Sequence, residues 1–139
     1  MVTFSVKNNV ATIEDDKGDE TLVELVMDLL HSAIITHIMH WQTTSYAEHI
    51  ALGEFYSAMP DLVDDVVEAY QGKTKIILAN FPIEMDKYEG MAPLTYLEYL
   101  SAEMTECRAL FGTDSEIQNL VDAIADLIDS TMYKLRRFK

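Results

Sequence analysis

A chain of 139 residues is long enough for one domain whose hydrophobic core needs no disulfide to hold it. Its 49% hydrophobic content excludes intrinsic disorder as a class. Its formal net charge of −14 disfavours nucleic-acid binding, because an acidic surface repels phosphate. We expect no signal peptide, because the N-terminus lacks an apolar h-region. We expect no transmembrane helix, because histidines or carboxylates interrupt the longest apolar stretches. The single cysteine, Cys107, fits a reducing compartment, and we expect a cytoplasmic protein.

Residues 1–18 differ from the rest of the chain. Residues 2–6 and 10–13 are short β-prone runs that flank Asn8 and Asn9. This pattern predicts a small hairpin or an ordered N-terminal arm. Because an isolated hairpin is only marginally stable, we expect it to dock on the remaining domain, residues 19–139.

A first helix is predicted over residues 20–44. Asp19 is a candidate N-cap, and Thr21 with Glu24 has the spacing of a capping box. Apolar residues cover nearly all sides of this helix instead of forming one stripe. A helix of this kind is buried on more than one side, so we expect a second partner, most simply another subunit.

A second helix is predicted over residues 46–71, with Gly72 as its C-terminal cap residue. Pro60 lies inside it, so the helix either kinks or breaks there. We favour a kink, because the apolar periodicity resumes at Leu62. Residues 73–92 then form a connection too long for a simple turn, but long enough to run the length of a bundle.

A third helix is predicted over residues 93–111, with Pro93 in its first turn. A fourth follows over residues 114–136, where Thr113 and Glu116 have capping-box spacing. Two helical hairpins joined by a long crossover have the connectivity of ferritin-like bundles. We therefore predict an all-α fold, a ferritin-like four-helix bundle.

All four histidines lie between residues 31 and 49. His37 and His40 share one helix face, and His49 falls at the start of the second helix. Asp64 and Glu68 lie four residues apart further along that helix. Imidazole and carboxylate groups together suit iron, manganese or zinc. The alternative is that the carboxylates form a solvated face and the histidines are capping or packing residues. No Glu-x-x-His motif occurs, which disfavours a di-iron centre within one bundle.

The segment from His40 to Glu68 resembles the Dps miniferritins. His40-Trp41 matches one motif of that family and Ala47-Glu48-His49 matches another, with Asp64 and Glu68 fifteen and nineteen residues after His49. The resemblance implies a ferroxidase site between two subunits, with the histidines from one chain and the carboxylates from the other. His37 is then a reserve ligand.

Two features depart from the family pattern. The segment between His40 and His49 is shorter, and Gly53 stands where the family has Asp, so that Glu54 would have to replace it. An alternative alignment matches Ile50-Ala51-Leu52 to the family and leaves no second histidine. The sequence from His40 to His49 also resembles a family of small uncharacterised proteins of tailed bacteriophages.

Three hypotheses follow from these resemblances and from the residues. The first is an iron-binding protein that oxidises Fe(II) and stores the iron, with Zn or Mn as the alternative metal. It would be a homo-oligomer, either a dimer or a cage, in which Trp41 quenches stray oxidising equivalents. The second is a non-catalytic bacteriophage structural or accessory protein, placed in the cytoplasm of a bacterial host or in the virion. The third is a partner-binding module that uses the N-terminal arm or the basic end, residues 134–139.

Overall fold

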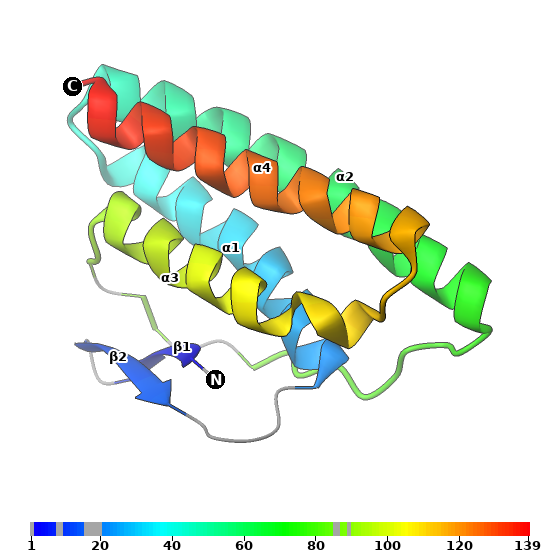
Figure 1. Ribbon diagram of the computed structural model, residues 1–139. Helices are drawn as coiled ribbons and strands as arrows, with labels where there is room; N and C mark the ends of the chain where they lie inside the picture. The colour runs from blue at the N-terminus through cyan, green and yellow to red at the C-terminus, as the bar shows by residue number, and fades with distance from the viewer. Residues whose placement is uncertain (1, 8–9, 16–20, 85–86, 89) are drawn as a thin grey trace.

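The computed structural model describes residues 2–7, 10–15, 21–84, 87–88 and 90–139 (Figure 1). The body of the protein is helical, which confirms the predicted all-α class. The elements in chain order are β1 (Val2–Lys7), β2 (Val10–Asp15), α1 (Leu22–Gln42), α2 (Tyr46–Thr74), α3 (Pro93–Cys107), the 3₁₀ turn η1 (Arg108–Phe111) and α4 (Ser115–Arg137). The two strands pair antiparallel as a hairpin, with Lys7 opposite Val10, within the segment predicted as an arm or hairpin.

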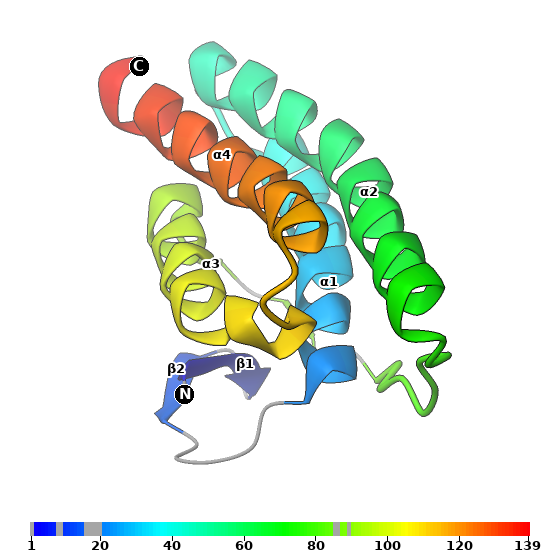
Figure 2. The same cartoon turned by 45° about the vertical axis from the view of Figure 1, so that its right-hand side comes forward.

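The four helices form a bundle in which α1 and α2 run antiparallel, as do α3 and α4 (Figures 1 and 2). The crossover after α2 carries the chain back along the bundle, so that α3 begins at the end where α2 began. Helix α2 packs against both α1 and α4, whereas α1 and α3 lie against each other much less closely. The N-terminal hairpin lies beside α3.

Local capping explains where α1 begins. Thr21 is its N-cap, and its hydroxyl accepts a hydrogen bond from the backbone of Glu24, whose side chain accepts one from the backbone of Thr21. This is the predicted capping box. Asp19 and Glu20, the predicted first residues, lie outside the described residues. At its other end the helix stops at Gln42, two residues before the predicted Thr44.

Helix α2 is longer than predicted. It passes through Gly72 and ends at Thr74, because Lys75 adopts the left-handed conformation (φ 62°) and donates its N–H to the carbonyl of Gln71. The prediction that Gly72 ends the helix is therefore wrong. The helix continues unbroken through Pro60, which excludes the alternative of two separate helices. Pro60 lies on the exposed side, where water can satisfy the carbonyl that loses its helical partner.

The corner between α3 and α4 also differs in detail. The α-helix ends at Cys107, and the predicted last turn is the 3₁₀ turn η1. Asp114, not Thr113, caps α4, because its carboxylate accepts the backbone N–H groups of Glu116 and Ile117. The predicted capping box at Thr113 is wrong. Lys73 at the end of α2 reaches the same carboxylate at 3.0 Å, so one side chain caps α4 and ties it to α2.

The core lies between the four helices and holds, among others, Leu25, Leu29, Leu52, Phe55, Met59, Leu97, Val121, Ile124 and Ile128. Two buried hydroxyls on α1 are satisfied within the helix: Ser32 donates to the carbonyl of Leu29 at 2.5 Å and Thr36 to that of Ser32 at 2.6 Å. By length and composition alone α1 is the one described helix that could cross a membrane. In this fold it supplies seven buried residues to the bundle.

Truncation of Leu52, whose side chain is fully buried, tests this core. We expect Leu52→Ala to lower the free energy of unfolding by about 2–5 kcal/mol, through lost transfer energy and a residual cavity. Leu110→Ala is the matched control, because Leu110 is exposed on η1 and should change the value by under about 0.5 kcal/mol. Urea unfolding followed by circular dichroism gives both values, and equal losses would contradict the packing.

The Asp114 cap predicts a pH dependence of stability. The hydrogen bond from Lys73 lowers the pKa of Asp114 below its ordinary 3.8 in the folded protein. Its stabilising effect is therefore fully present above the unfolded pKa and is lost as the pH falls through the lowered pKa. Asp114→Asn keeps a capping oxygen but loses the charge. We expect the wild type to melt higher than this variant at about pH 6, with the gap closing toward about pH 2. A gap that is independent of pH would refute this role of the charge.

Candidate functional site

His40 and His49 close the hairpin between α1 and α2. The Nδ1 atom of His40 lies 2.6 Å from the backbone carbonyl of His49, and Nδ1 of His49 lies 2.8 Å from the carbonyl of His40. The two rings stack with centroids 3.6 Å apart and planes inclined by 16°. The last turn of α1 and the first turn of α2 are thus joined by a reciprocal pair of side chain to backbone bonds.

These bonds assign the ring hydrogens. A carbonyl oxygen only accepts, so each Nδ1 carries the hydrogen that it donates. In the neutral imidazole the other nitrogen, Nε2, then keeps its lone pair and remains available as a hydrogen-bond acceptor or metal ligand. A hydrogen bond from Nδ1–H to a backbone carbonyl is a common way to orient a metal-binding histidine.

Gly53 provides the space for the His40 ring. A Cβ atom at this position would lie 3.2 Å from Cε1 and 3.4 Å from Nδ1 of His40. The ring has little freedom to move away, because it is stacked on His49 and bonded to a carbonyl. The glycine at the position where the Dps pattern has Asp is therefore explained by packing within this chain. Glu54, the predicted substitute, instead forms an ion pair with Lys134 of α4 at 2.5 Å.

Further aromatic contacts extend this histidine cluster, which consists of His37, His40 and His49. The ring of His37 stacks on Tyr56 of α2 with centroids 3.8 Å apart, and the rings of Trp41 and His40 also lie near it, at 4.3 Å and 6.0 Å. Trp41 itself is 68% exposed. The three predicted histidines are therefore together, and the predicted Trp41 lies beside them on the surface.

Asp64 and Glu68 are not part of this cluster within one chain. Both are exposed on the second half of α2. Along a continuous helix, fifteen residues from His49 to Asp64 span about 22 Å and nineteen to Glu68 about 28 Å. A single chain therefore cannot bring these carboxylates to the histidines.

The histidine cluster alone does not chelate one metal ion. The lone pair of Nε2 lies in the ring plane, and the two nearly parallel planes of His40 and His49 direct their lone pairs past each other. Across the described residues, no group of three or more His, Cys, Asp or Glu side chains is placed to hold a metal ion. Within the part of the chain that the structure describes, the histidine cluster is therefore not a complete metal site.

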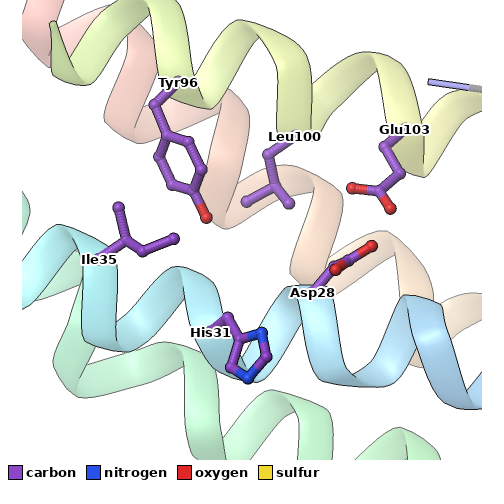
Figure 3. A pocket seen from close by; sticks show the side chains of 6 residues that line it. All are labelled: Asp28, His31, Ile35, Tyr96, Leu100 and Glu103. Atoms are coloured by element: carbon purple, nitrogen blue, oxygen red, sulfur yellow. The ribbon is translucent and has the colours of Figure 1, made fainter. Parts of the chain in front are cut away.

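A second polar site lies between α1 and α3 (Figure 3). A cavity of about 50 Å³ is lined by Asp28, His31, Ile35, Tyr96, Leu100 and Glu103. Glu103 is only 2% exposed and Tyr96 only 3%. Burial, reinforced by the negative charges of Asp28 and Glu103, raises the pKa of Tyr96 well above its ordinary value, so the phenol stays protonated. The cavity is large enough for ordered water.

Sequence reasoning missed this cavity, although a signal for it exists. Asp28 and His31 are three residues apart on one helix. Glu103 follows Tyr96 and Leu100 at intervals of seven and three, which places a carboxylate in the apolar stripe of α3. A charged residue at a core position is the pattern that marks such a site.

The fold and these contacts define an all-α, four-helix protein with a histidine-closed hairpin. Residues 40–135 match the model of a family described as a family of unknown function, DUF5856. This match covers more than half of the chain, and the chain belongs to that family. The matched segment begins at His40, so it includes both histidines of the hairpin closure, Gly53, Asp64 and Glu68. No curated protein and no solved structure matches the chain.

A pair of glycine substitutions in α2 tests the His40 contact. Gly72→Ala meets no atom within 4 Å, so we expect it to stabilise the protein by about 0.5 kcal/mol through helix propensity. Gly53→Ala gains the same propensity, but overpacking against His40 costs about 1–3 kcal/mol, so we expect net destabilisation. Urea unfolding measures both changes. A Gly53→Ala protein as stable as Gly72→Ala would contradict the close approach of ring and backbone.

Proposed function

We propose that this protein is a ferritin-like, homo-oligomeric metal-binding protein that takes up Fe(II) at sites shared between two chains. His40 and His49 of one chain supply imidazole nitrogens, and Asp64 and Glu68 of the partner supply carboxylate oxygens. Such a mixed donor set suits iron, with zinc and manganese as competitors. Oxidation of Fe(II) by peroxide or oxygen at this site would make the protein a ferroxidase, with Trp41 as a nearby electron donor.

The observation that carries this proposal is the state of the two imidazoles. Both Nδ1 atoms bond to backbone carbonyls, which leaves the two Nε2 atoms as oriented ligands. Because the rings are stacked, these two Nε2 atoms cannot both bind the same ion. Asp64 and Glu68 are exposed on α2, the helix that also carries His49, and lie too far along it to bind the same ion as the histidines of one chain. A second chain supplies the missing ligands most simply. The up, down, down, up order of the helices supports the ferritin-like relationship.

A second candidate function is favoured by the Gly53 contact. Because Gly53 and the reciprocal bonds already explain why both histidines are held in place, the histidine cluster would then be a clamp that closes the hairpin. The protein would be a non-catalytic bundle, such as a bacteriophage structural or accessory component. This alternative predicts no metal binding by the folded oligomer.

Anaerobic titration of the metal-free protein with Fe(II), followed by peroxide or air, separates the two functions. The metal-binding function predicts about one to two ions per subunit and rapid oxidation on addition of the oxidant. We expect His49→Gln and Glu68→Gln each to weaken binding by more than about tenfold, because each removes a ligand. Asp126→Asn, which changes an exposed acid on α4, is the matched control. Absence of Fe(II) binding by a correctly folded wild-type oligomer would refute the metal-binding function.

A further inference from the structure

Helices α3 and α4 lie side by side and enclose a cavity that shares no residue with the histidine cluster (Figure 2). We call it the α3–α4 cavity. Its volume is about 160 Å³, against about 50 Å³ for the cavity at Glu103. Two small side chains in its lining, Ser101 on α3 and Ala125 on α4, leave space between the helices. An apolar cavity of about 150 Å³ can hold benzene, so this one has room for a molecule of several heavy atoms.

The lining combines an apolar floor with polar groups at the edge. Met104 and Ile128 are 3% and 1% exposed, and they form the floor. Thr105 and Asp129 are exposed and Arg108 is half-buried, so these three lie where the cavity opens to solvent. An apolar surface with a few polar groups that can fix the orientation of a ligand is the usual composition of a small-molecule site.

Arg108 is held in place along one edge of its guanidinium group. Its Nε donates to Oε1 of Gln118 at 3.0 Å, and its Nη2 forms an ion pair with Asp122. The side chain of Gln118 in turn donates to the carbonyl of Arg108 at 2.9 Å. Its remaining nitrogen, Nη1, donates to no other described residue. The cavity therefore has an oriented cation with N–H groups to spare, and a guanidinium group favours carboxylate as its partner.

Asp129 supplies the opposite charge at the other end of the cavity. Its carboxylate forms no ion pair or hydrogen bond with the part of the chain that the structure describes. Because Arg108 is paired with Asp122, and Asp129 follows two helical turns later, the cation and the anion are about 10 Å apart along α4. The carboxylate and ammonium groups of one α-amino acid, with a hydrogen bond of about 2.9 Å at each end, span about 9 Å. The spacing therefore fits a ligand of that length.

We propose that the α3–α4 cavity binds a small amino acid with an aliphatic side chain. Nη1 of Arg108 donates to the α-carboxylate, Asp129 accepts from the α-ammonium group, and the aliphatic side chain lies on Met104 and Ile128. A lone anion fits less well because Asp129 and Asp122 repel it, and a lone metal cation fits less well because Arg108 repels it. This site goes beyond the proposed metal-binding function and uses none of its residues.

Calorimetric titration of the full-length, metal-free wild type with three related compounds tests the ligand class. The compounds are L-valine, isovalerate, which lacks the ammonium group of valine, and isobutylamine, which lacks its carboxylate. We expect valine to bind at one site per chain. Isovalerate and isobutylamine should each bind at least about tenfold more weakly, because each leaves one charged group of the cavity without a partner.

Three variants test the residues. Asp129→Asn should weaken valine binding by more than about tenfold, because it removes the charge that the ammonium group meets. Asp126→Asn is the matched control and should bind as the wild type does, because Asp126 is an exposed acid of α4 outside the cavity. Ala125→Leu fills the cavity without changing its charge, so it should abolish binding. Circular dichroism checks that each variant is folded.

Four outcomes would overturn the proposal. These are a wild type that binds no valine at about 10 mM, a half-ligand that binds as tightly as valine, equal binding by the Asp129→Asn and Asp126→Asn proteins, and binding that persists in folded Ala125→Leu. Failure of the proposed function looks different. A wild type that binds valine but no Fe(II) would support this site and refute the metal-binding function.

Discussion

Helix α1 has apolar side chains on nearly all of its surface, and the need to bury them determines much of the structure. One side contributes Leu25 and Leu29 to the core, and another packs along α2. Hydroxyls that fall inside, such as those of Ser32 and Thr36, are satisfied by carbonyls of the same helix, so they cost little there. The remaining side, with Ile34 and Trp41, stays exposed. A single chain therefore leaves part of this apolar helix exposed. The proposed homo-oligomer would cover that part.

The closure of the α1–α2 hairpin depends on one small residue, Gly53. Gly53 allows the His40 ring to lie against the backbone of α2, and this position brings the ring onto His49. The same bonds that fix the hairpin also leave each Nε2 free of the backbone. A structural clamp and a pair of oriented ligands are therefore compatible uses of the same two side chains.

Local features of the sequence predicted local structure well. The capping box at Thr21 involves residues three apart, so its signal lies entirely within one turn. The cap of α4 was mistaken because the choice of Asp114 over Thr113 depends on the preceding 3₁₀ turn and on Lys73, which comes from a different helix. The end of α2 was mistaken because Lys75, not the glycine, adopts the left-handed conformation.

The candidate site was predictable only in part, for a similar reason. The spacing of His37, His40 and His49 indicated a cluster, because all three lie near one helix–helix turn. Ring stacking and the role of Gly53 depend on how two helices approach each other, which spacing alone does not fix. The cavity at Glu103 was missed because its side chains come from α1 and α3, far apart in the sequence.

Subunit mixing tests most directly whether imidazoles of one chain and carboxylates of another form one metal site. One variant combines His40→Gln with His49→Gln, and the other combines Asp64→Asn with Glu68→Gln. Each alone should bind no Fe(II) at the site. A mixed dimer regains one intact site of its two, so an equal mixture after subunit exchange should recover about one quarter of the wild-type capacity. Exchange without any recovery of binding would contradict a site shared between chains.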